Sequence, residues 1–332
     1  MTSKLSYKFL YALIVIFSFS IRASELNLSL EPKLAYDKGI LLFQQNKYPE
    51  AKPFLSIALE HGYPAAGLML ADTYSTNPFV LTKKESFYTR KAAELDSVIG
   101  MLRMGGPGSF QVNNSAWTTK IMPEIKVLAK QGNAFAMRLL SINLTDEQEK
   151  FDWFKKAANA GDSFAQYELA RRYRMGDGWF LIPGKREREV ERLFKASADS
   201  GDREGMLAYA KLLKKKNDVQ GYTSIMKQLV DMGDAKAIYS LASTNRRENN
   251  NKVAAYHYKI FIESMGEGVG EDRVTYNTAR DMYKMVTANM LGDEIEQIER
   301  DVNEYLQSHV VHYQKRIEEY EYTLESLKQQ IK

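Results

Sequence analysis

Small and apolar side chains recur in a fixed frame along the chain, and short polar turns separate them. Between Phe151 and Gly178, two alanines precede Gly161, another alanine follows four residues later and a leucine eight residues later. Positions four and eight residues apart lie on one face of a helix. The pattern therefore predicts two antiparallel helices, Asp152–Ala160 and Ser163–Met175, with Gly176 closing the second and Lys185–Ser200 opening the next pair.

The same frame recurs at markers 62, 96, 132, 161, 201, 233 and 266, at steps of 29 to 40 residues. A period near 34 to 36 residues is typical of solenoids built from helical hairpins. Glycine ends a helix in the left-handed conformation at little cost, and the Asp or Asn that often follows caps the next helix. The expected structural positions are Ala58, Gly62, Ala66, Leu70, Ala129, Gly132, Ala136, Leu140, Ala157, Ala158, Gly161, Ala165, Leu169, Tyr173, Gly176, Ala198, Gly201, Gly233, Ala237 and Leu241.

These motifs resemble the Sel1-like repeat family, which is related to tetratricopeptide repeats. Residues 151–201 carry the pattern most fully, and 36–74, 117–144 and 219–245 carry it in part. The stretch 96–108 departs from it, because Asp96 replaces the glycine and Gly105-Gly-Pro-Gly108 interrupts the second helix. The resemblance implies an all-α, right-handed solenoid that works as an adaptor for other proteins. In bacterial members it implies envelope assembly, signalling, host interaction or immunity against type VI secretion effectors.

The chain after residue 290 has another pattern. From Asp293 to Lys332 there is no glycine or proline, and apolar residues recur at a mean spacing of 3.6. This predicts a solenoid over 35–290 followed by one long amphipathic helix over 291–332. The helix would cap the last repeat, or its second half from Val310 would dimerise or bind a partner, with Tyr313 and Tyr320 as contact residues.

Residues 1–23 have the layout of a secretory signal peptide, followed by a short linker over 24–34. Lys4 and Lys8 precede an uncharged apolar run, and Ala23 stands at a plausible cleavage position. The run is short for a membrane span, although Arg22 keeps an uncleaved anchor as the alternative. We expect a periplasmic or secreted protein without a stable membrane span after cleavage.

Charge and cysteine content narrow the function classes. The chain has 46 basic and 42 acidic residues, and 43 and 42 remain when residues 1–23, with Lys4, Lys8 and Arg22, are removed. A nearly neutral chain gives no support for a nucleic-acid partner. The absence of cysteine excludes disulfides, thiolate metal sites and a bacterial lipid anchor.

Few residues are candidates for chemistry. His309 and His312 lie three apart on the expected helix but lack a third ligand, so we predict no metal site. Gly105–Gly108 and Gly266–Gly270 lack the lysine and hydroxyl residue of a phosphate loop. We predict no cofactor and no catalytic residues. Trp179 and Phe180, in a loop after a glycine, are either buried between hairpins or displayed to a partner.

The sequence thus favours a periplasmic scaffold that binds a protein through its solenoid surface, with immunity against a type VI effector as one specific form. Two alternatives stay open. One is an envelope enzyme, or a regulator of one, acting on peptidoglycan, and the other is a structural protein that self-assembles or forms a homodimer through the last helix.

Overall fold

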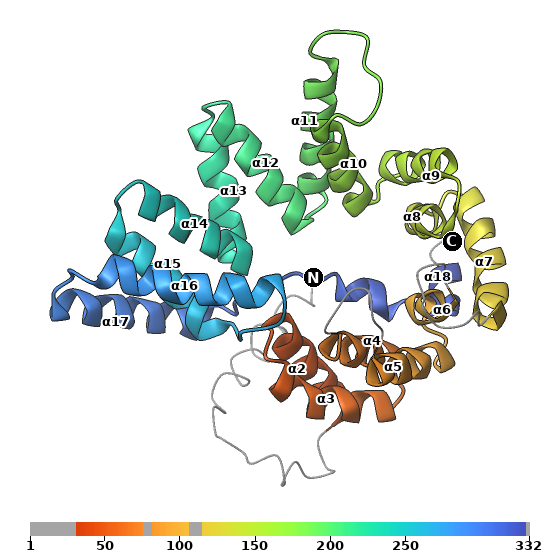
Figure 1. Ribbon diagram of the computed structural model, residues 1–332, viewed down its shortest axis with the longest axis horizontal. Helices are drawn as coiled ribbons and strands as arrows, with labels where there is room; N and C mark the ends of the chain where they lie inside the picture. The colour runs from red at the N-terminus through yellow and green to blue at the C-terminus, as the bar shows by residue number, and fades with distance from the viewer. Residues whose placement is uncertain (1–30, 76–81, 106–114, 330–332) are drawn as a thin grey trace, which may run out of the picture. The chain divides into compact units, whose positions relative to one another are not determined.

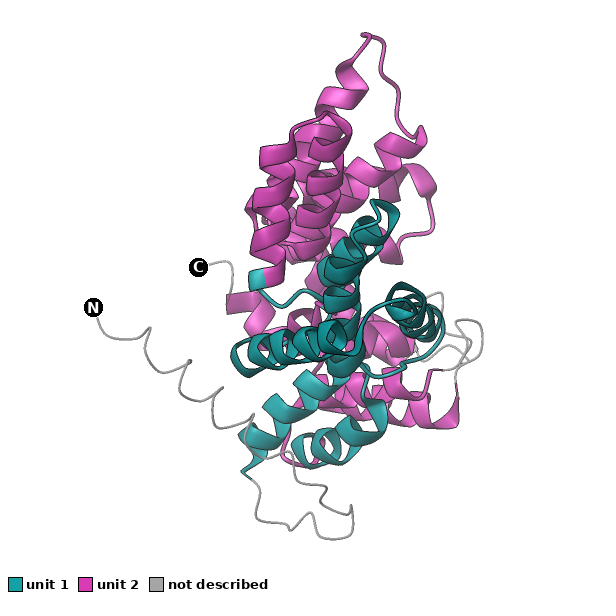
Figure 2. Cartoon of the chain, turned by 90° about the vertical axis from the view of Figure 1, so that its left-hand side faces the viewer, with its two compact units in different colours: residues 1–58, 231–313 teal, residues 59–230, 314–332 magenta. Residues whose placement is uncertain are grey.

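The computed structural model describes residues 31–75, 82–105 and 115–329, and these form helices joined by short turns (Figure 1). The proposed signal peptide and most of its linker, and Gly106–Gly108, lie outside these ranges. The chain divides into two compact units, coloured in Figure 2. Unit 1 comprises residues up to 58 and 231–313, and unit 2 comprises 59–230 and 314–332.

The helices of unit 1 are α2 (Pro32–Gln44), most of α3 (Tyr48–Glu60), α14 (Ala235–Arg247), α15 (Asn251–Ser264), α16 (Glu271–Thr287) and α17 (Gly292–Ser308). Those of unit 2 are α4 (Pro64–Thr73), α5 (Lys83–Glu94), α6 (Val98–Gly105), α7 (Ser115–Lys130), α8 (Ala134–Asn143), α9 (Glu147–Asn159), α10 (Ser163–Met175), α11 (Lys185–Asp199), α12 (Arg203–Lys215), most of α13 (Val219–Asp231), the 3₁₀ helix η2 (Ile317–Glu321) and α18 (Leu324–Gln329). From α4 to α12 each helix packs against the next in the chain, which confirms the expected all-α solenoid of hairpins.

The turn at Gly161 shows why these residues form hairpins. Gly161 has a φ of 101°, a conformation that ends α9 and that residues with a side chain rarely adopt. The next residue, Asp162, accepts a hydrogen bond from the backbone N–H of Ala165 at 2.7 Å and so caps α10. The same glycine-then-cap arrangement occurs before α8, α12 and α14.

Small residues let the paired helices approach closely. A Cβ atom added at Gly205 of α12 would lie 2.2 Å from the Ser197 hydroxyl of α11. At Gly100 of α6, an added Cβ would lie 2.8 Å from the backbone nitrogen of Ala93 of α5. These two glycines occupy the position that alanine holds in the hairpins marked by Gly62, Gly132 and Gly161, so the size limit at this position is steric.

The expected repeat positions fall into three groups. The buried ones are Ala58, Ala66, Leu70, Ala129, Ala136, Leu140, Ala157, Ala158, Ala165, Leu169, Tyr173 and Ala237. Ala198 and Leu241 are half-buried. The glycines with positive φ are Gly62, Gly132, Gly161, Gly176, Gly201 and Gly233.

Asp96 keeps the turn geometry where the glycine is missing. Its φ is 61°, in the left-handed region that aspartate tolerates better than most residues. Gly266, in contrast, does not have a positive φ, and the turn between α15 and α16 uses Gly268 and Gly270 instead. The weakest sequence marker therefore does not have the local geometry of the others.

The prediction of one helix over 291–332 is wrong, because α17 ends at Ser308. Residues 309–313 are extended and pair with a turn of unit 1. His312 donates its backbone N–H to the Gly233 carbonyl at 3.0 Å and accepts from Ala235 at 3.1 Å. The backbone passes so close that a Cβ at Gly233 would lie 2.0 Å from the Val310 carbonyl oxygen.

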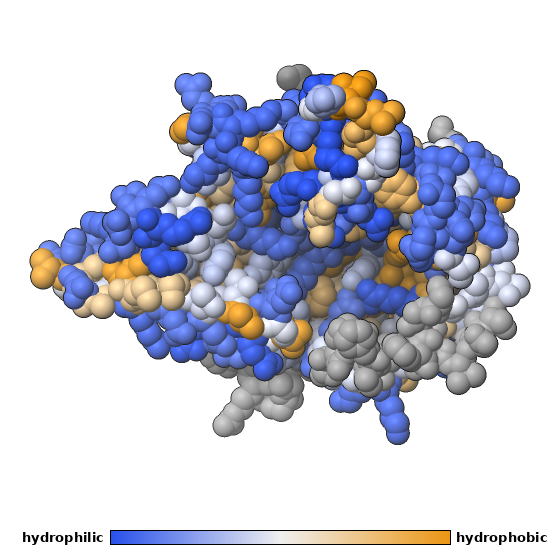
Figure 3. Space-filling model, turned by 45° about the horizontal axis from the view of Figure 1, so that its top comes forward, coloured by the Kyte–Doolittle hydropathy of each residue, from blue (hydrophilic) through white to orange (hydrophobic). Residues whose placement is uncertain are grey.

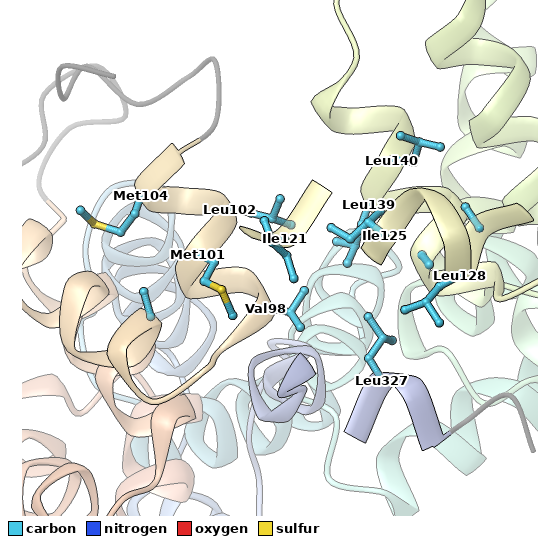
Figure 4. Packing of buried hydrophobic residues seen from close by; sticks show 13 residues of the cluster. Val98, Met101, Leu102, Met104, Ile121, Ile125, Leu128, Leu139, Leu140 and Leu327 are labelled. Atoms are coloured by element: carbon cyan, nitrogen blue, oxygen red, sulfur yellow. The ribbon is translucent and has the colours of Figure 1, made fainter. Parts of the chain in front are cut away.

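Later residues of the same stretch contribute to the core of unit 2. Leu327 of α18 is fully buried in a cluster of apolar side chains from α6, α7 and α8, among them Met101, Ile125 and Leu139 (Figure 4). Burial of a leucine side chain stabilises a protein by roughly 1.5–3 kcal/mol. Within the described residues, the apolar period after residue 290 thus marked positions that are buried or half-buried, although most of them do not lie on one helix.

Substitution of the turn glycines tests this account. Gly161→Ala has room for its methyl group but must keep a positive φ, so we expect a loss of about 1 kcal/mol in unfolding free energy. Gly233→Ala adds a collision with the Val310 carbonyl and should cost clearly more. Urea unfolding followed by circular dichroism measures both.

Gly292→Ala is the matched control. This glycine begins α17 without a positive φ and without a close neighbour, so the variant should unfold like the parent chain. Equal losses for Gly161→Ala and Gly233→Ala would contradict the close approach of residues 309–313 to the Gly233 turn.

Candidate functional site

Residues 314–329 lie along three turns of unit 2, and we call them the inner segment. It is irregular except for the short helices η2 and α18. The segment meets the turn before α12, then the turn before α10, and then the turn between α5 and α6. The sequence frame marked these three turns through Gly201, Gly161 and Asp96, but it gave no indication of what lies on them.

The first contact is at the cap of α12. Asp202 accepts from the Gly205 N–H with one carboxylate oxygen, at 2.8 Å, and from the Arg316 guanidinium with the other, at 3.1 Å. The side-chain oxygen of Gln314 accepts from the backbone N–H of Arg203 at 3.0 Å. One aspartate thus caps a helix and binds the segment at the same time.

The second contact is a buried charge network around Arg138 of α8. Its Nε donates to both carboxylate oxygens of Asp162, at 3.0 and 2.9 Å, and its Nη2 donates to Glu319 at 2.8 Å. Burial acts to lower the pKa of Arg138, but the charges of Asp162 and Glu319 outweigh it and raise that pKa. The arginine stays charged and holds the segment by charge-assisted hydrogen bonds.

An aromatic ring joins these two contacts. The guanidinium of Arg316 lies 4.0 Å from the ring centroid of Phe164, and that of Arg138 lies 5.0 Å from it. Phe164 is in the first turn of α10, so the ring is fixed beside the Asp162 cap. Cation–π contacts of this kind add to the ion pairs when water is partly excluded.

The third contact centres on Tyr320. Its hydroxyl donates to Asp72 of α4 at 2.7 Å and accepts from Arg103 of α6 at 2.9 Å, while Arg103 and Asp72 pair directly at 2.6 Å. Burial raises the pKa of Tyr320, Arg103 opposes this, and Asp72 adds to it, so the phenol stays protonated and can donate.

The segment then pairs with the chain by backbone hydrogen bonds. Val98 donates to the Tyr322 carbonyl at 2.9 Å, and Leu324 donates to the Asp96 carbonyl at 3.3 Å. Between them Thr323 forms an isolated antiparallel bridge with Ser97. Lys328 closes the run with an ion pair to Glu124 at 2.9 Å.

A second candidate surface is the loop between α10 and α11, residues 175–184. Trp179 is 85% exposed, Leu181 80% and Ile182 57%, and Met175 is exposed beside them. Figure 3 shows hydrophobic side chains at the surface in the upper part of the view, where this loop lies in Figure 1. Trp179 is therefore exposed and not buried between hairpins.

Hydrogen bonds and ring contacts hold the loop 175–184 in its conformation. Arg186 donates to the carbonyl oxygens of Tyr173, Asp177 and Gly178 at 2.5 to 2.9 Å. Phe180 stacks edge-on against Tyr173, with ring centroids 5.0 Å apart, and the Arg186 guanidinium lies 4.8 Å from the Phe180 ring centroid. Phe180 thus supports the loop, while its neighbours Trp179 and Leu181 point outward.

Other candidates from the sequence are placed differently. Tyr313 is only 5% exposed and packs on Phe261 in unit 1, so it is not a displayed contact, and Tyr320 is held in the network described above. His309 stacks on Tyr305, whereas His312 lies in the extended stretch. In the described ranges no three His, Asp or Glu residues are grouped to hold a metal ion.

The fold defines an all-α hairpin solenoid, and comparison with known proteins places it beside Sel1-repeat structures. A protective antigen of uropathogenic Escherichia coli strains with an SLR fold is 14% identical, with a TM-score of 0.47. The alignment covers 84% of this chain and 62% of the antigen. A Sel1 repeat protein from Oxalobacter formigenes is 15% identical, with a TM-score of 0.39 and coverage of 81% and 86%.

No protein-family model and no curated protein matches the chain. The chain spans less than two thirds of the Escherichia coli antigen, and likeness at this level does not assign a function. Over the described part of the chain, no helix is long and apolar enough to cross a bilayer.

The role of Tyr320 can be tested by removing one oxygen atom. Tyr320→Phe leaves Asp72 and Arg103 without their shared hydroxyl. Because both partners are charged, we expect a loss of roughly 1.5 kcal/mol in unfolding free energy. Tyr322→Phe on the same segment is the control, because the contact described for its side chain is ring packing on Phe135. Thermal and urea unfolding of both variants gives the comparison, and equal stability of the two would refute the network.

Proposed function

We propose that this protein is an exported, periplasmic scaffold that binds another protein through the loop 175–184. The observation that carries the proposal is the display of Trp179, Leu181 and Ile182 on a loop that is braced by Arg186. Tryptophan is among the residues most enriched at the energetic centre of protein interfaces. A loop held in one conformation loses less entropy when a partner binds than a flexible loop does, and this favours affinity.

The flanks of the loop give the proposed interface its polar rim. Residues 171–188 contain six basic and two acidic side chains, whereas the chain as a whole is nearly neutral. Several of these cations already have local roles: Arg171 pairs with Glu168, and Arg174 lies over Phe194. The composition favours a partner with an apolar pocket and acidic margins, which would bind faster at low salt.

Immunity against a type VI secretion effector is the specific form of this function that we put forward for testing. Neutralisation by binding requires a stable, displayed surface and no catalytic group on this chain, and the loop is such a surface. An effector that acts in the periplasm, such as a lipase, would meet the exported chain there. Envelope assembly is the competing form, and the identity of the captured protein separates the two.

Partner capture is the first test. The chain from residue 24 onward serves as bait for envelope extract and for co-expressed candidate effectors. We expect Trp179→Ala with Leu181→Ala to lower the affinity for the captured protein at least tenfold, because two exposed anchors are removed. Val274→Ala is the control, because the Val274 side chain is also exposed, at 67%, but lies on α16 and not in the loop.

The result of the capture experiment distinguishes the proposed interface from its alternatives. Equal capture by the loop variant and the parent would remove the loop from the interface. If the captured protein is a toxin, co-production in the periplasm should restore growth with the parent chain and not with the loop variant. Turnover of peptidoglycan by the purified chain would instead support the enzyme alternative.

The proposed export and cleavage of the chain can be tested separately. After expression in a Gram-negative host, the protein should be released with the periplasmic fraction, and its N-terminal sequence should begin at Ser24. Mass spectrometry of the intact protein measures this. A membrane-bound chain that still begins at Met1 would show that residues 1–23 remain as an anchor.

A further inference from the structure

The inner segment has the features of a peptide bound to the turns of unit 2. Its side chains enter separate contacts, with Arg316 on Asp202, Glu319 on Arg138 and Tyr320 between Asp72 and Arg103. Its backbone pairs with residues 96–98 through two hydrogen bonds. Extended partner peptides bind other proteins with this combination of backbone pairing and side-chain pockets.

Most of these contacts are polar and could be made by a segment of another protein. Glu319 and Tyr320 supply a carboxylate and a phenol to arginines that are otherwise paired with acids of the repeats, Asp162 and Asp72. Leu327 supplies a fully buried apolar anchor, which Figure 4 shows beside the cluster. The recognised pattern is thus an acidic residue, a tyrosine directly after it, and a large apolar residue seven positions further on.

The segment fits its site imperfectly. Arg316 has φ 47° and ψ 39°. This left-handed conformation is unfavourable for a residue with a side chain. The Nε of Arg316 is buried and has no hydrogen-bond partner within the described residues. Beside it lies a polar cavity of about 160 Å³, lined among others by Ser163, Ser200 and Glu318.

We propose that residues 314–329 are an internal ligand, which a partner protein displaces with an acidic, tyrosine-containing segment of its own. This rests on the proposed function as a protein-binding scaffold and adds a second contact, with its own chemistry, to the loop 175–184. A partner segment that makes the Arg138 and Arg103 contacts without the Arg316 strain gains over the internal one. Because the internal segment is tethered, it competes at a high effective concentration, and only a partner also held elsewhere overcomes it efficiently.

The inner segment suggests two tools for testing this proposal, a peptide probe and a disulfide that locks the segment in place. The probe is a fluorescent synthetic peptide with the sequence of residues 312–329. The lock uses the antiparallel bridge between Ser97 and Thr323. Residues opposed in such a bridge have Cα atoms roughly 5 Å apart. This separation is within the range of a disulfide. The chain has no cysteine, so Ser97→Cys with Thr323→Cys forms a single reversible link.

The experiment measures peptide binding to the full chain by fluorescence anisotropy. The loosened chain carries Glu319→Gln and Tyr320→Phe, which remove internal contacts while the receptor residues Arg138 and Arg103 stay unchanged. We expect it to bind the peptide at least tenfold more tightly than the unsubstituted chain. With the lock added to the loosened chain, oxidation should abolish this binding and reduction should restore it.

Two controls show that the peptide occupies the proposed contacts. A peptide with glutamine for Glu319 and phenylalanine for Tyr320 should bind the loosened chain at least tenfold more weakly. Hydrogen exchange at the Val98 amide, which is bonded to Tyr322, should quicken in the loosened chain while the amides of α10 stay protected. Protected α10 amides would show that the variant is folded.

The proposal is overturned if the folded, loosened chain does not bind the peptide, or if the oxidised and reduced locks bind it equally. These results are separable from the proposed function. Loss of partner capture in the Trp179 and Leu181 variant tests the loop and is unaffected by the lock on the peptide site. If capture of the partner depends on the loop but is the same with the disulfide lock reduced or oxidised, the result would support the proposed scaffold function. It would contradict the proposal that residues 314–329 are an internal ligand.

Discussion

Unit 2 depends on the carboxylates of Asp162 and Asp202, which directly follow two of the turn glycines. Asp162 and Asp202 each satisfy a free backbone N–H at the start of a helix. Such a cap is worth about 1 kcal/mol. Each aspartate also faces a guanidinium, Arg138 or Arg316. The same two residues therefore set the hairpin geometry and hold the segment that crosses it, so the segment cannot be placed without the turns.

The turns could be predicted from the sequence because their causes are local. A positive φ at Gly161, a cap at Asp162 and close packing at Ala157 each require a particular residue type within a few positions. The helix predicted beyond Ser308 was wrong because periodicity reports which positions are buried, not the backbone that buries them. Val310 and Val311 are adjacent β-branched residues with weak helix propensity, and they were the available sign of an extended stretch.

The candidate sites also differ in how far they could be predicted from the sequence. Trp179 lies three residues after Gly176, the glycine that ends α10, and this local context allowed its exposure to be considered from the sequence. The contact between Arg138 and Glu319 joins residues 181 positions apart, and nothing in a single sequence pairs them. Tyr320 was chosen as a partner contact because a helical period placed it on the apolar face of one long helix, whereas the actual backbone carries its hydroxyl to Asp72.

The loop 175–184 and the contact sites of the inner segment differ in their exposure to water. This difference suits them to different steps of binding. The loop 175–184 exposes apolar groups that gain free energy as soon as any matching surface covers them, so it is suited to the first encounter. The Arg138 site is buried, the Arg103 site is half-buried, and both are already paired, so an incoming segment must exchange one carboxylate or phenol for another. Such an exchange gains little free energy in total but rejects segments without the matching groups, since they would lose the hydrogen bonds from Arg138 and Arg103. Affinity would thus come mainly from the open loop and selectivity from the occupied turns.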